Sequence, residues 1–234
     1  MLDDRDYMRR TPRFEPRWLV TVILVAINVV IFVAQNVADS ADNLHIYNKF
    51  ALSVDGLKHG RVWQLLTFQF LHLPLNAGGI FHLLGNLFAI QLFGPAVEKT
   101  IGRLSFIKLY LLSGSLGGLV QMAGGLVSTA HFGGAVVGAS AGAFGLLAAL
   151  ATLYPDRRLH PFFLPFAIRA DVLLMLSVAG TLICLFLPSG QVAHCAHLGG
   201  IFAGFMFARR WARNRGAGVF VGTVNLLESA PAPE

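Results

Sequence analysis

The chain has 234 residues, of which 55% are hydrophobic and only 13% charged, and its formal net charge is +6. A soluble domain carries roughly 25% charged residues, so this composition excludes soluble globular, secreted, collagen-like, coiled-coil and disordered proteins. Three stretches hold no charged residue at all, namely residues 18–38, 109–155 and 172–208. One apolar helix needs about 20 residues to cross a bilayer. The pattern therefore predicts an all-α polytopic membrane protein.

Hydropathy and turn residues predict six spans in one helical bundle. The first is expected at about residues 18–37, and the charged and apolar mixture that follows, residues 38–78, is typical of an external loop with short helices lying in the membrane surface. The other five spans are expected at about residues 79–97, 104–127, 140–154, 172–187 and 196–208. The membrane domain thus covers residues 18–210, between tails of residues 1–17 and 211–234.

The positive charges predict which side each loop occupies. Fifteen of the 18 Lys and Arg residues lie before the first span, in the segments 98–108 and 155–171, and from Arg209 onward, whereas the loop 38–78 carries only Lys49, Lys58 and Arg61. Cytoplasmic loops collect positive charge, so both termini are expected to be cytoplasmic and the 38–78 loop external. The basic residues are therefore a topology signal, and no nucleic-acid partner is expected. The expected location is the bacterial cytoplasmic (inner) membrane.

Polar side chains inside membrane spans are costly and are therefore candidates for function. His82 and Asn86 lie four residues apart on the second span, Ser140 opens the fourth, and His197 lies at the start of the sixth. Counting back to the first charged residue at the cytoplasmic end of each span places all four roughly 18–24 Å above that edge, at 1.5 Å per residue. A hydroxyl, two imidazoles and an amide in one layer suit a nucleophile, a base and oxyanion donors.

Small residues indicate which helices approach each other. Gly138 and Ala141 flank Ser140, and Gly200 and Gly204 follow His197 with the G-x-x-x-G spacing of close-packed membrane helices. Close approach of the fourth and sixth spans would bring Ser140 within reach of His197.

These motifs resemble those of rhomboid intramembrane serine proteases. The matching segments, in chain order across residues 18–210, are Arg61-Val62-Trp63, Phe70-Leu71-His72, His82-x-x-x-Asn86, Gly94-x-x-x-Glu98 with Gly102, Gly138-Ala139-Ser140, and Ala196-His197-x-x-Gly200-x-x-x-Gly204. The resemblance implies a serine nucleophile at Ser140, a base at His197 and an oxyanion hole that uses His82 and Asn86. The sequence departs from the family at Ala141, usually Gly, at Phe144, often Tyr, at Gln64, usually Arg, and in a longer 73–79 segment.

The expected function is an intramembrane serine endopeptidase that cuts single-span membrane proteins near their outer end. No acidic residue falls in the layer of Ser140 and His197, so a Ser–His dyad is expected rather than a triad. No H-E-x-x-H motif is present, and neither a metal nor a cofactor is expected. The alternative is a catalytically inactive rhomboid-like protein that binds transmembrane segments. The presence of both Ser140 and His197 favours the enzyme.

Overall fold

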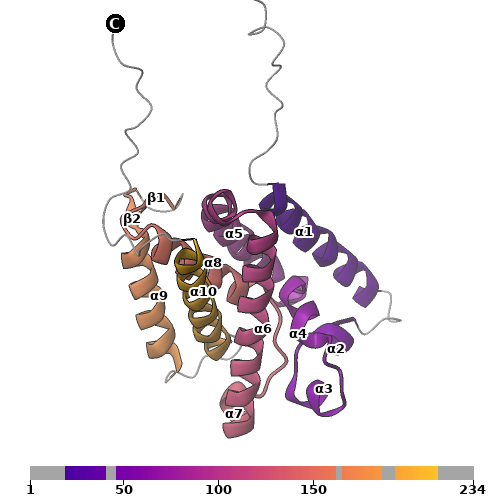
Figure 1. The fold of residues 1–234 in the computed structure, drawn as a ribbon. Helices are drawn as coiled ribbons and strands as arrows, with labels where there is room; N and C mark the ends of the chain where they lie inside the picture. The colour runs from indigo at the N-terminus through magenta and orange to yellow at the C-terminus, as the bar shows by residue number, and fades with distance from the viewer. Residues whose placement is uncertain (1–18, 41–45, 162–164, 186–192, 216–234) are drawn as a thin grey trace, which may run out of the picture.

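The computed structural model describes residues 19–40, 46–161, 165–185 and 193–215, and within them the chain is mostly helical (Figure 1). The long helices are α1 (Leu19–Ser40), α5 (Gly79–Ile101), α6 (Arg103–Val127), α8 (Ser140–Leu153), α9 (Ala170–Leu185) and α10 (His194–Asn214). The all-α class expected from composition is thereby confirmed. The predicted tail 1–17 and all but the first residues of the tail 211–234 lie outside the described residues.

Each predicted span coincides with one of these helices, within a few residues except at the last. Helices α1, α5 and α6 are long and apolar enough to cross a membrane, whereas α8 and α9 are shorter apolar helices. The last predicted span, residues 196–208, lies within α10, which begins at His194 and continues to Asn214. The count of six membrane crossings and the orientation of the termini stay predictions of the sequence.

The loop between α1 and α5 contains short helices, as its mixed sequence indicates. They are α2 (Ile46–Phe50), α3 (Val54–Lys58), α4 (Gln64–Thr67), η2 (Phe68–Phe70) and η3 (Leu75–Ala77). A further short helix, α7 (Thr129–Phe132), follows α6. In Figure 1, α3 and α7 lie at the end of the bundle opposite to the start of α1.

A two-stranded hairpin between α8 and α9 was not predicted. Strand β1 (Arg158–Leu159) pairs antiparallel with β2 (Ile168–Arg169). Two-residue strands are too short to produce a recognisable period in the sequence. The Arg169 guanidinium forms ion pairs with Asp156 at 2.8 Å and with Asp171 at 2.6 Å, and thereby joins the end of α8 to the start of α9.

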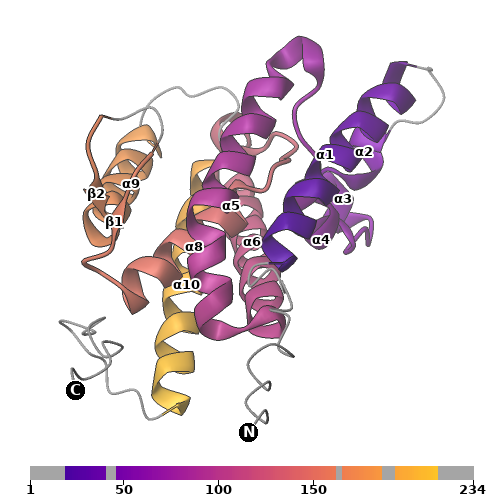
Figure 2. The ribbon, with the colours of Figure 1, turned by 90° about the horizontal axis from the view of Figure 1, so that it is seen from above.

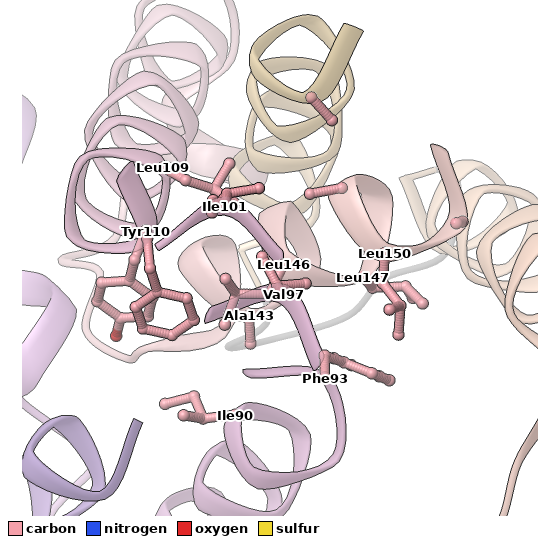
Figure 3. Close-up of a cluster of buried hydrophobic side chains, with 14 of the residues drawn as sticks. Ile90, Phe93, Val97, Ile101, Leu109, Tyr110, Ala143, Leu146, Leu147 and Leu150 are labelled. Atoms are coloured by element: carbon pink, nitrogen blue, oxygen red, sulfur yellow. The ribbon is translucent and has the colours of Figure 1, made fainter. Parts of the chain in front are cut away.

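The hydrophobic core lies where α5, α6 and α8 meet (Figure 3). Ile90, Phe106, Leu109, Leu146 and Leu150 in this cluster are completely buried. At about 1.5–3 kcal/mol for each fully buried large apolar side chain in an aqueous reference state, such a cluster would dominate folding. In a bilayer the same contacts act mainly by close packing.

A buried carboxylate fastens α1 to α5. Glu98 accepts hydrogen bonds from the backbone amides of Val20 and Thr21, at 2.9 and 2.8 Å, and from the Thr21 hydroxyl at 2.7 Å. The first amides of a helix have no partner within the helix, so Glu98 satisfies two of them for α1.

Helix α10 lies between α6 and α8 and makes its most extensive contacts with these two helices, whereas α9 is peripheral. The two views agree that α1 and α9 lie on opposite sides of the bundle (Figures 1 and 2). The layer of polar residues expected from the sequence is thus carried by the three helices α5, α8 and α10.

Candidate active site

The segment before α8 places Ser140 at the start of that helix. Val136 pairs with Leu52 as an isolated β-bridge, and the Gly138 amide donates to the Phe68 carbonyl at 2.9 Å. Gly138 has φ = 126°, a backbone conformation that side chains rarely adopt. A Cβ added there would also lie 2.7 Å from His82 Nε2. Only glycine therefore lets the chain turn into α8 against that imidazole.

The structure brings Ser140 and His197 together. His197 Nε2 lies 2.9 Å from Ser140 Oγ, a hydrogen bond across 57 residues of sequence. The Phe144 ring, one turn further along α8, stacks against the imidazole with centroids 4.4 Å apart. The hydrogen bond and the stacked ring together define the orientation of the His197 side chain.

Two glycines on α10 make this approach possible. A Cβ at Gly200 would overlap the Ala141 carbonyl oxygen, and one at Gly204 would overlap the Gly145 carbonyl oxygen. The α8 and α10 backbones are therefore in direct contact, as the G-x-x-x-G spacing predicts. The Ala141 methyl does not occupy this contact: it faces α6, where a Cβ at Gly117 would lie 2.9 Å from it. Glycine at position 117 thus leaves the room that alanine at position 141 needs.

His82 and Asn86 on α5 lie next to the segment that leads into Ser140. The hypothetical Gly138 Cβ lies 3.5 Å from Asn86 Nδ2, as well as close to His82 Nε2. Asn86 is buried, and its Nδ2 has no hydrogen-bond partner among the described residues. A buried amide without a partner is a donor available to a bound oxygen atom.

A hydrogen bond determines the tautomer of His82. The Leu73 backbone amide donates to His82 Nδ1 at 3.3 Å. A nitrogen that accepts a hydrogen bond carries no proton, so the neutral imidazole carries its proton on Nε2. The N–H group of His82 is thereby directed toward Gly138, on the same side as Asn86 Nδ2.

A cavity of about 260 Å³ opens beside Ser140, between α5, α8 and α9. Its lining is mostly apolar, with Ser140 and Asn86 among the few polar groups. The residues that line it are Gly85, Asn86, Ala89, Phe93, Ser140, Ala143, Phe144, Leu147, Leu173 and Ser177. Ser140 and Asn86 therefore line one space.

Comparison with known proteins identifies the family. The rhomboid domain model matches residues 59–214. The chain belongs to the rhomboid family. Together with the apolar helices, this makes it an integral membrane protein.

Three rhomboid relatives illustrate the extent of the similarity. RHOMBOID-like protein 1 of Arabidopsis thaliana is 32% identical over 160 residues, which are 67% of this chain and 36% of the plant protein. Rhomboid-like protease 1 of Toxoplasma gondii is 33% identical over 153 residues, 64% of this chain and 47% of that protein. The human presenilin-associated rhomboid-like protein, mitochondrial, is 30% identical over 129 residues, 55% of this chain and 34% of the human protein. The chain thus spans less than half the length of each.

Two further polar residues surround the rhomboid site, and the sequence did not reveal the burial of the second. Gln121 on α6 accepts a hydrogen bond from the Ala196 amide at 3.2 Å, and thereby supports the first turn of α10 beside His197. His72, in the loop before α5, is fully buried, with its ring 5.2 Å from that of His82. Burial, and secondarily the neighbouring His82, lowers the pKa of His72 to about 3.

Acidic and metal-binding groups are not gathered at this site within the described residues. No Asp or Glu side chain of the described ranges is hydrogen-bonded to His197, whose side-chain partner there is Ser140. Nor do three His, Cys, Asp or Glu residues of these ranges cluster in a way that could hold a metal ion.

Proposed function

We propose that the chain is an intramembrane serine endopeptidase with Ser140 as nucleophile and His197 as general base. The observation that carries this proposal is the 2.9 Å contact between Ser140 Oγ and His197 Nε2 at the edge of the cavity. That distance is within the range for direct proton transfer from a hydroxyl to an imidazole. Membership of the rhomboid family supports the same reaction class.

The chemistry follows the usual course of acyl transfer. Ser140 Oγ attacks the carbonyl carbon of the substrate while its proton passes to His197 Nε2. The tetrahedral intermediate then collapses, His197 returns that proton to the leaving amine, and an ester with Ser140 remains. Water, deprotonated by His197, hydrolyses the ester and regenerates the hydroxyl. Each step uses only a nucleophile and one base, consistent with a dyad.

Three donors are proposed for the negative charge on the intermediate. Asn86 Nδ2 has no other partner among the described residues, His82 carries its proton on the nitrogen next to Gly138, and the Ser140 amide lies at the unpaired start of α8. Loss of one such donor typically costs about 10²–10³-fold in rate. Asn86→Ala and His82→Ala are therefore expected to lower kcat by about that factor.

The substrate is proposed to be a single-span membrane protein that is cut near its outer end. The cavity is bounded by α9, the most loosely packed of the long helices, so a transmembrane segment could reach Ser140 from the bilayer. A peptide bond inside a helix is shielded by its own hydrogen bonds, so local unwinding is required and helix-breaking residues in the substrate favour it.

The proposal includes six crossings with both termini cytoplasmic. The distribution of Lys and Arg supports it, as does the position of the basic β1–β2 hairpin and the start of α1 at one end of the bundle (Figure 1). The bacterial cytoplasmic membrane stays a prediction of the sequence, because the relatives named above come from a plant, a parasite and a human mitochondrial protein.

The decisive experiment compares two serine variants in proteoliposomes. Ser140→Ala is expected to abolish cleavage of a single-span reporter and labelling by a fluorophosphonate probe. Ser113→Ala is the matched control, because this buried hydroxyl on α6 has no hydrogen-bond partner among the described residues. Cleavage that persists in Ser140→Ala would refute the proposal. A wild-type protein that binds the reporter without cutting it would instead support the inactive alternative.

A further inference from the structure

A buried glutamine on α1 holds the loop that precedes α5. Gln35 is 2% exposed. Its Nε2 donates to the His72 carbonyl at 2.6 Å, and its Oε1 accepts from the His72 amide at 3.1 Å. Both functional groups of the side chain are thus bonded to the backbone of a single loop residue. The chain around residue 72 is thereby held in one register against α1.

We call the pair of hydrogen bonds from Gln35 to the His72 backbone the Gln35 clamp. The residue after His72 bonds to His82. The Leu73 amide, directly after His72, donates to His82 Nδ1. A second contact from α1 secures the same segment further on, since Asn36 Oδ1 accepts from the Leu75 amide at 3.0 Å. On the α5 side, a Cβ at Gly79 would overlap the Leu73 carbonyl oxygen, so the segment lies directly against the start of α5.

We propose that Gln35 is a positioning residue for the oxyanion hole, acting through the His72–Leu73 backbone to keep the proton of His82 on Nε2. The inference rests on the proposed function, in which His82 Nε2–H stabilises the intermediate. Without the clamp the Leu73 amide can leave His82 Nδ1, and the imidazole can then carry its proton on either nitrogen. With the proton on Nδ1, the nitrogen beside Gly138 becomes an acceptor and repels an oxyanion.

A glutamine is well suited to this task. It offers one donor and one acceptor in a fixed geometry, which matches the carbonyl and amide of one residue in an extended segment. A buried side chain with both groups satisfied also carries no desolvation penalty from unpaired atoms. Helix α1 lies outside the residues 59–214 that the rhomboid domain matches, so this chain would control its site from outside that region.

The first test reads the tautomer directly. The ¹⁵N spectrum of selectively histidine-labelled protein in detergent distinguishes a protonated ring nitrogen from an unprotonated one, and comparison with His82→Ala assigns the signals. In the wild type His82 is expected to be protonated on Nε2 alone. In Gln35→Met, which keeps the length and removes both hydrogen bonds, a mixture of tautomers is expected. An unchanged His82 signal in Gln35→Met would overturn the inference.

The second test is kinetic and uses the same variant. Gln35→Met is expected to lower kcat by about 10-fold with little change in KM, less than the ~10²–10³-fold cost of losing the donor itself. In a His82→Ala background the further effect of Gln35→Met should vanish, because both changes then remove the same donor. Independent, multiplicative effects of the two substitutions would contradict a role through His82.

Two further variants separate positioning from general damage. Thr21→Val removes a buried hydrogen bond from α1 to Glu98, at the opposite end of the helix from Gln35. It should lower the Tm without altering kcat or the His82 spectrum. Gln35→Glu keeps an acceptor for the His72 amide but places a carboxylate oxygen against the His72 carbonyl oxygen, so it should also give a mixture of His82 tautomers. Because the spectrum needs no substrate, an inactive wild type would refute the proposed function and leave the clamp independently testable.

Discussion

Helices α10 and α9 flank the same region and are packed in opposite ways. On α10, Gly200 and Gly204 lie directly against carbonyl groups of α8, and Gly204 leaves no room for a single methyl group. On α9 the only described buried residues are Ala170 and Thr181, and a Cβ at Gly180 would meet nothing within 4 Å. The protein is closely packed beside the 2.9 Å contact of Ser140 and His197, and loosely packed where the cavity opens.

This difference in packing between α10 and α9 fits the proposed function. In the proposed mechanism, proton transfer between Ser140 and His197 requires a constant separation, which direct backbone contact between two helices provides. Entry of the proposed transmembrane substrate requires a wall that can yield, and a helix with few buried side chains yields at small cost. The two properties reside on different helices, so substitutions can alter one without the other.

The largest effect is expected from filling the α8–α10 contact. Gly204→Val would place two methyl groups into the Gly145 backbone, and over-packing of this kind costs about 1–3 kcal/mol or more. The helices must separate, so cleavage should be lost and the Tm should fall. Gly180→Val on α9 is the matched control, and its cleavage rate and Tm should equal those of the wild type within error. Equal effects of the two substitutions on Tm and cleavage would remove the contrast between the helices.

The second prediction concerns the wall of the cavity. Leu173 lies on α9 and lines the cavity beside Ser140. Leu173→Trp should fill part of the 260 Å³ and lower kcat/KM by about 10-fold for substrates with a large residue before the cut, the loss expected for a few misplaced methylene groups. Substrates with a small residue there should be less affected. A Tm that fell as far as in Gly204→Val would show α9 to be as tightly packed as α10.

The third prediction is a smaller expected effect, on stability alone. Ala141→Gly removes a methyl group that fits against Gly117 on α6, and adds the conformational freedom of glycine within a helix. The sum is a loss of about 1–2 kcal/mol. Because the backbone of residue 141, rather than its methyl, contacts Gly200, cleavage should stay within about 2-fold of wild type. A marked gain in kcat would mean that the alanine hinders the Ser–His contact.

The sequence predicts the closely packed helices α8 and α10 much better than the region around α9. Apolar runs place the long helices, and the depth of Ser140 and His197 brings them into one layer, because depth in a bilayer is a one-dimensional property that residue counting captures. The G-x-x-x-G spacing predicts the backbone contact between α8 and α10, because this spacing too can be read along a single helix. The β1–β2 hairpin was missed, since two residues in each strand leave no periodic signal.

The Gln35 clamp could not be predicted for a different reason. Its partners are backbone groups of His72, 37 residues away, and backbone groups carry no sequence signature. The tautomer of His82 likewise depends on the Leu73 amide, which any residue other than proline supplies. What a sequence alone leaves open at this site is therefore the set of main-chain contacts, which tertiary structure decides.

The last prediction concerns stability at acid pH and tests the packing around His72. Burial lowers the pKa of His72 to about 3, against 6.5 in the unfolded chain, so the folded state favours the neutral imidazole. Above pH 6.5 the His72 ring is neutral in the folded and the unfolded state, so its titration does not change the free energy of unfolding. As the pH falls below 6.5 only the unfolded chain gains the proton, so stability declines progressively down to about pH 3.

Replacing His72 should reduce that decline. His72→Phe keeps an aromatic ring in the buried position and removes the titrating group, so the Tm measured in detergent between pH 7 and about pH 4 should fall less steeply than in the wild type. His160→Gln is the control, because His160 is exposed in the hairpin beside α9, and its profile should follow that of the wild type. If His72→Phe kept the full acid dependence, His72 would have to be open to solvent, and the loop clamped by Gln35 would be as loosely packed as the α9 side.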